Sequence, residues 1–185
     1  KALNERWHRW YSCSLCEQDY HGVVACALGW ACWKTYVGRP EVDWTRSDAM
    51  TVLGNGLSDV KRYEDALPVR EAHLAMLRRV GASEDSMLIV QSNLASTYEK
   101  LGHFDKSLRM RRDVYPGTLR LFGEEHENSL IEANNYAVSL ENLKRFKEAK
   151  SLLCKTVPVT RRVLGEGHIL TLNMRWLYAQ AIYRD

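Results

Sequence analysis

Four residues of metal-binding type lie close together near the start of the sequence. Cys13 and Cys16 form a Cys-x2-Cys pair, His21 follows after four residues, and Cys26 follows after four more. A Cys-x2-Cys loop can bring two thiolates onto one tetrahedral ion, and a histidine and a further cysteine can complete the site. Cys32 could replace one of these ligands. The spacing therefore offers a zinc site formed by Cys13, Cys16, His21 and Cys26.

The same cysteines have a second interpretation as buried apolar side chains. Residues 23–37 are expected to form a helix on which Cys26 is a small apolar residue, and free cysteines are commonly buried. Nucleic-acid-binding zinc knuckles carry an aromatic residue after the first cysteine and glycines in the loop, but this sequence has Ser14, Glu17 and Tyr20 there. A redox dithiol is not favoured either, because no βαβ pattern surrounds the pair. Zinc binding and buried thiols both stay open.

Motifs of the common enzyme classes are missing from the sequence. It has no glycine-rich phosphate loop, no nucleophile elbow and no His-Glu-x-x-His. Gly54-x-Gly56 falls in an expected helix and has no strand before it. The sequence therefore predicts a non-catalytic protein that requires no cofactor, with zinc as the one metal to consider.

The composition narrows the class of protein further. The 185 residues are 45% hydrophobic and 26% charged, with 26 Lys and Arg against 23 Asp and Glu. A net charge of +3 is far from the one-sided field of a dedicated nucleic-acid binder, so no specific nucleic acid is expected. No stretch reaches the roughly 18 uninterrupted apolar residues of a membrane span. Five cysteines without a secretory signal indicate a reducing compartment, and we expect a cytoplasmic protein with no membrane partner.

Most of the chain repeats with a period of 42 residues. Segments 87–128 and 129–170 are identical at 13 positions, whereas average composition gives about two or three by chance. A more diverged copy covers 47–86, and 171–185 matches the first half of another. A period of this length is typical of stacked repeat arrays.

The residue composition changes near Trp44. Four of the five cysteines lie between Cys13 and Cys32, and five of the six tryptophans lie before residue 45. We therefore expect a Cys/Trp-rich head, 1–44, with the candidate zinc site followed by a helix, and a repeat array, 45–185. Because the array would stop after one helix of its last copy, we expect the chain to belong to a longer protein.

Each repeat is expected to contain two antiparallel helices. Val90, Leu94 and Tyr98 recur every four residues along the first helix, and Gly102 follows as a C-cap. The second helix contains Pro116 or its equivalent Pro158, which is expected to kink or break it because proline removes a backbone hydrogen bond. The expected helices are 88–101, 104–121, 130–143, 146–163 and 172–183.

The repeat resembles a known family in two sets of residues. The helix strings resemble the tetratricopeptide repeat, and the Gly-x-x-His strings ending at His126 and His168 are similar to the linker of kinesin light chains. The helix strings are Asn93-Leu94-Ala95-x2-Tyr98-x2-Leu101-Gly102-x-Phe104 and Asn135-Tyr136-Ala137-x2-Leu140-x2-Leu143-x2-Phe146. This resemblance implies an all-α fold of tandem antiparallel helix pairs stacked into a right-handed superhelix, a TPR-like α-solenoid, after the head.

The resemblance also implies a function. In kinesin light chain-like repeats the first helix of each pair lines a concave groove that binds cargo and adaptor peptides. A scaffold for protein–protein interaction that binds a partner protein or peptide is therefore expected, with a motor or adaptor complex as one setting. The matching groove positions are Ser92, Asn93, Ser96, Asn134, Asn135, Asn173 and Gln180.

The asparagines and the charged residues each have more than one interpretation. An asparagine amide can pair with a peptide backbone, but Asn93 and Asn135 could instead connect neighbouring helices. His126 and His168 are expected to fix the linker turn and not to catalyse. The basic residues of the second helices are expected on a solvated outer face: Arg109, Arg111, Arg112, Lys147, Lys150, Arg161 and Arg162. The alternative function is a zinc-binding adaptor, in which the head recognises the partner and the array is a spacer.

Overall fold

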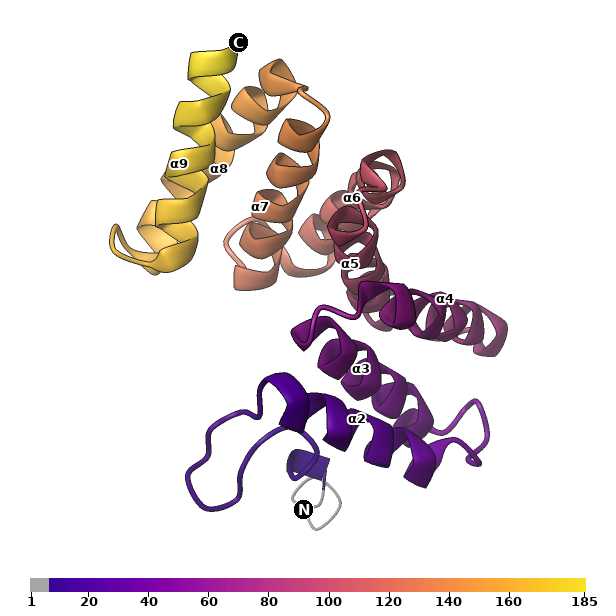
Figure 1. The fold of residues 1–185 in the computed structure, drawn as a ribbon. Helices are drawn as coiled ribbons and strands as arrows, with labels where there is room; N and C mark the ends of the chain where they lie inside the picture. Colours follow the sequence, from indigo (N-terminus) through magenta and orange to yellow (C-terminus); the bar gives the residue numbers. More distant parts are fainter. Residues whose placement is uncertain (1–6) are drawn as a thin grey trace. The chain divides into compact units, whose positions relative to one another are not determined.

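The computed structural model describes residues 7–185, and every regular element in that range is a helix. The predicted all-α class is confirmed, and the one β-type contact of the described residues is an isolated bridge between Ser12 and Asp19. The helices follow one another through short turns (Figure 1). They are α2 (Gly22–Tyr36), α3 (Trp44–Asp59), α4 (Tyr63–Val80), α5 (Glu84–Lys100), α6 (Phe104–Phe122), α7 (Glu127–Asn142), α8 (Phe146–Leu164) and α9 (Ile169–Arg184). No helix of the described residues is long and apolar enough to cross a membrane.

The chain divides into two compact units, Lys1–Thr97 and Tyr98–Asp185. In the N-terminal unit, α2 packs against α3, and α3 packs against α4. The predicted head helix therefore lies in the same unit as the first repeat. The predicted right-handed superhelix concerns the shape of the whole array and stays a prediction.

The contact between α2 and α3 depends on glycine. A Cβ atom on Gly56 would lie 2.6 Å from the carbonyl oxygen of Ala25 and 2.9 Å from the Cα of Cys26. Across the same contact, a Cβ on Gly29 would lie 3.0 Å from the Cα of Leu53. Because no side chain fits between the two backbones, the helices approach more closely here than other residues would allow. Gly56 is thus explained by the packing of α2 on α3, whereas a Cβ on Gly54 would meet Arg70 of α4.

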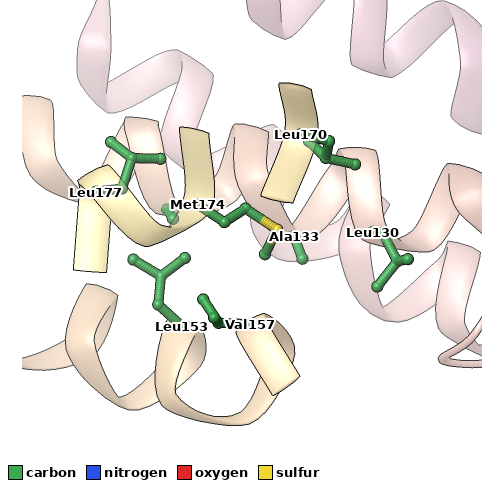
Figure 2. Packing of buried hydrophobic residues seen from close by; sticks show 8 residues of the cluster. Leu130, Ala133, Leu153, Val157, Leu170, Met174 and Leu177 are labelled. Carbon is green, nitrogen blue, oxygen red and sulfur yellow. The ribbon is translucent and has the colours of Figure 1, made fainter. Parts of the chain in front are cut away.

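The C-terminal unit pairs α6 with α7, α7 with α8 and α8 with α9. Its main core cluster joins side chains of α7, α8 and α9. Figure 2 shows Met174 of α9 among Leu153 and Val157 of α8 and Ala133 of α7. These residues are spaced three or four apart on their helices, as the periodicity of the repeat predicts.

Helices α7 and α9, each the first helix of its repeat, begin three residues earlier than predicted. His126 caps α7, since its Nδ1 accepts a hydrogen bond from the backbone N–H of Asn128 at 3.2 Å. His168 caps α9 through the N–H of Leu170 at 3.3 Å. The histidines therefore fix the linker turn, as predicted, and they do so as N-caps.

Of the two outcomes expected at the prolines of the second helices, a break is wrong and a kink stays a prediction. Both α6 and α8 run through their prolines, Pro116 and Pro158. Each proline is exposed, and so is the residue four positions earlier, Arg112 or Cys154, whose carbonyl loses its partner. Water can satisfy a carbonyl on the exposed face, which lowers the cost of the missing hydrogen bond.

The expectation of a solvated basic face is wrong for Arg111. Its side chain is 2% exposed and pairs with Glu132 of α7 at 2.8 Å. The equivalent residue of α4, Arg70, is also buried, and it donates to Thr97 Oγ1 at 2.6 Å and Asn55 Oδ1 at 3.1 Å. Burial lowers the pKa of Arg70 to about 10. These two arginines therefore belong to the interior of the repeat.

Candidate functional site

The outward faces of α7 and α9 form the candidate site of the C-terminal unit. The two helices hold the same place in successive repeats and contact each other. Each carries a stripe of residues spaced three and four apart that are exposed or half-buried, and the half-buried Val138 also packs against the core cluster. We call these two stripes the α7/α9 surface: Ile131, Asn134, Val138, Asn173, Trp176 and Gln180.

Three of the predicted groove residues lie on this surface. Asn173 is exposed and Gln180 is half-buried, whereas the Oδ1 atom of Asn134 is buried and has no hydrogen-bond partner among the described residues. Their amide groups can both donate and accept hydrogen bonds.

Asn135 lies beside the stripe and near the buried ion pair. Its Nδ2 donates to Glu132 Oε1 at 3.5 Å, and Glu132 is the partner of Arg111. A hydrogen bond of this length is weak. Since both residues belong to α7, the contact lies within one helix and leaves the two interpretations of Asn135 open.

The other three predicted groove residues lie on α5, in the N-terminal unit. Ser92, Asn93 and Ser96 are half-buried. The Ser96 hydroxyl donates to the Ser92 carbonyl at 3.1 Å. The backbone carbonyl of Asn93 accepts hydrogen bonds from Arg70 and Thr97.

Sequence reasoning from amides alone missed the apolar members of the α7/α9 surface. Trp176 is 61% exposed and occupies the position of Asn134 one repeat later. Ile131 of α7 is also exposed. Tyr183 of α9, three residues after Gln180, continues the stripe and is exposed as well. The signal was available, because these residues share the three- and four-residue spacing of the predicted amides.

A cleft of about 520 Å³ lies elsewhere in the C-terminal unit, between α6 and α8 and over part of α7. Tyr115, Tyr136 and Leu152 line it, and the two tyrosine rings are 5.9 Å apart. Burial raises the pKa of Tyr115. None of the predicted groove residues lines this cleft.

The candidate zinc ligands are separated in the structure. Cys13 and Cys16 lie in one turn, whose backbone N–H groups lower the pKa of Cys13, mainly through Cys16. Cys26, however, is buried with Leu53, Leu57 and Ala66. The ring of His21 is exposed, with Nδ1 4.0 Å from Asp59. Within residues 7–185 no three metal-binding side chains come together, so these four residues as placed do not fit a zinc ion.

Comparison with known proteins agrees with the helix-pair architecture. The family model of the tetratricopeptide repeat matches residues 133–170. No curated protein matches the sequence.

Three solved structures illustrate the likeness in fold. One, described as a putative kinesin light chain of Podospora anserina with nearly identical TPR-like repeats, has a TM-score of 0.71 at 20% identity over 87% of this chain and 75% of that one. A point variant of the same protein has a TM-score of 0.72 with the same identity and coverage. BtubC (BKLC) of P. vanneervenii has a TM-score of 0.68 at 18% identity over 86% of this chain and 67% of that one.

The fold defines an α-solenoid built from antiparallel helix pairs. The chain has the fold of kinesin light chain-like TPR repeats, and its residues 133–170 match the tetratricopeptide repeat model.

Proposed function

We propose that the chain is a non-catalytic scaffold that binds a partner protein or peptide on the α7/α9 surface. The observation that carries this proposal is the exposed Trp176 beside amides on two adjacent helices. Tryptophan is the residue type most enriched among binding hot spots. The neighbouring amides can pair with the backbone of an extended peptide whatever its side chains.

The fold supports the same proposal. Tetratricopeptide repeats are interaction modules, and the structurally similar proteins above are described as kinesin light chains or BKLC. A cytoplasmic motor or adaptor complex is therefore the setting we propose. In the N-terminal unit, Ser92 and Ser96 of α5 hold the positions of Asn134 and Gln180, and we assign them the same role. Asn93 holds the position of Asn135, beside the stripe.

The zinc-binding adaptor receives no support from the placement of its ligands. Cys26 would have to leave the core of the N-terminal unit to join Cys13 and Cys16. The scaffold proposal requires no such rearrangement.

Selection from a random peptide library displayed on phage tests the proposal with the whole chain as bait. We expect enriched peptides to lose about 2 kcal/mol of binding free energy, roughly 30-fold in Kd, on Trp176→Ala. Asn134→Ala should cost about 1 kcal/mol or more if its amide pairs with the peptide. Val163→Ala is the matched control, because Val163 is an exposed apolar residue on α8, outside the surface.

The peptide affinities of Trp176→Ala and Val163→Ala decide whether the α7/α9 surface is the binding site. Enriched peptides that bind Trp176→Ala and Val163→Ala equally well would place the binding site elsewhere. Thermal melting of each variant shows whether the fold is intact. Since Trp176 is mostly exposed, we expect little change in melting temperature.

A further inference from the structure

The N-terminal unit contains a cleft of about 410 Å³ that none of the functions above uses. It forms where residues 7–11 and 19–21 meet α2 and α3. Aromatic rings make up much of its wall: Trp7, Trp10, Tyr11 and Tyr20.

Other aromatic residues hold the two tryptophans in place. Trp7 packs against Tyr36 with ring centroids 5.2 Å apart and against Trp44 with centroids 5.3 Å apart. Trp10 packs edge-on against Tyr36 at 6.2 Å. These contacts link the cleft wall to the end of α2 and the start of α3. The rings are therefore ordered before any ligand arrives, which reduces the entropy lost on binding.

The cleft is acidic. Asp19, Asp48 and Asp59 line it, and no lysine or arginine is among its lining residues in the described chain. Asp59 already accepts a hydrogen bond from the backbone N–H of Gly22, at the start of α2. Its remaining charge and that of the other two carboxylates favour a positively charged ligand.

Asp48 is the carboxylate best suited to a ligand. It is half-buried on α3 and has no hydrogen-bond or ion-pair partner among the described residues. Burial raises the pKa of Asp48, because its charged form is poorly solvated. A cation in the cleft would compensate for that lost solvation.

The aromatic walls favour one kind of cation. A guanidinium group is planar, stacks on tryptophan faces and donates two parallel hydrogen bonds to a carboxylate. An ammonium group is a compact, strongly hydrated charge that gains less from a flat aromatic wall. The ring of Trp10 already shows this chemistry, since the guanidinium of Arg9 lies 5.1 Å from its centroid.

We propose that this cleft binds an arginine side chain of a partner peptide, with the guanidinium paired to Asp48 and flanked by Trp7 and Trp10. The volume suits one long side chain and excludes a folded element. The site lies within the N-terminal unit and is independent of the α7/α9 surface.

Binding is tested by NMR on the complete, ¹⁵N-labelled chain. The probes are the capped pentapeptide Gly-Gly-Arg-Gly-Gly and two variants of it. One variant has lysine in place of arginine, and the other has citrulline, which keeps the shape of arginine without its charge. We expect the arginine peptide to shift the indole N–H signals of Trp7 and Trp10 saturably, with an affinity about tenfold or more above that of the citrulline peptide. The lysine peptide should bind about threefold or more weakly than the arginine peptide. Trp7→Phe and Trp10→Phe assign the two signals.

Substitution of the carboxylate provides the second test. Asp48→Asn should weaken the arginine peptide about tenfold. Asp85→Asn removes the same charge from an exposed position of α5 outside the cleft, and should leave the affinity unchanged.

Several results would overturn the proposal. They are the lack of a saturable shift in the wild-type chain, equal affinity for the arginine and citrulline peptides, and unchanged affinity in Asp48→Asn. A lysine peptide that binds as tightly as the arginine peptide would overturn the guanidinium assignment. If Asp48→Asn does not fold, the comparison of peptides on the wild-type chain decides.

Discussion

The buried ion pair between α6 and α7 can be tested with a replacement that the chain itself supplies. Arg111 and Glu132 are 2.8 Å apart, with side chains 2% and 9% exposed. At the same two positions one repeat later stand Leu153 and Met174, which lie together in the core of the C-terminal unit. The same helix contact is thus built once from charged and once from apolar side chains.

We expect Glu132→Met alone to lower the free energy of unfolding by about 3–5 kcal/mol, because Arg111 would keep a buried charge without this partner. For a chain of this size that is a fall in melting temperature of roughly 6–20 °C. Adding Arg111→Leu should restore the wild-type free energy or exceed it by about 1–4 kcal/mol, since an apolar pair avoids the desolvation of two charges.

Urea denaturation followed by circular dichroism gives the free energies of the wild type, both single variants and the double variant, and hence the coupling energy. Glu166→Met is the matched control, because the Arg161–Glu166 pair is more than half exposed and should contribute little. The reasoning fails if Glu132→Met costs no more than Glu166→Met. It fails equally if the double variant loses the sum of the two single losses.

Three further predictions concern a helix contact, a buried histidine and the cysteines of the head. Gly56→Ala should lower the free energy of unfolding by about 1–3 kcal/mol through its clash with α2. Gly54→Ala, whose Cβ would lie 3.1 Å from the Arg70 side chain, makes a less severe contact and should cost less in the same urea titration. His73 is 3% exposed, and burial lowers its pKa to about 4, so its contribution to stability is complete above the unfolded pKa of about 6.5 and is lost as the pH falls towards 4. Urea midpoints measured from pH 7 to 4 should therefore fall less steeply in His73→Asn. Elemental analysis of the purified chain should find less than one equivalent of zinc, and a full equivalent whose chelation lowers the melting temperature would contradict the placement of Cys26.

Much of the fold could be predicted from the spacing of apolar residues. Leu94, Tyr98 and their equivalents mark one helix face, and the repeat doubles the evidence for each helix. Helix ends were less predictable, because an N-cap depends on one side chain. His126 is not among the usual capping residues, so the early start of α7 was missed.

The interior polar residues could not be predicted from the sequence. An arginine on an amphipathic helix is normally exposed, and Arg111 differs only because Glu132 meets it from the next helix. Such a pair becomes visible once two helices are placed side by side.

Buried and outward-facing positions of the repeat differ in the substitutions that the fold tolerates. On the buried contact, a change from charged to apolar must occur on both helices, because one charge left behind lacks its partner. On the α7/α9 surface, Ile131 becomes Asn173 one repeat later, and both side chains are exposed. Water solvates an exposed amide and leaves an exposed apolar side chain at small cost, so these positions can differ without loss of the fold. Because the fold does not fix the residue type at these outward positions, successive repeats can present different surfaces to a partner.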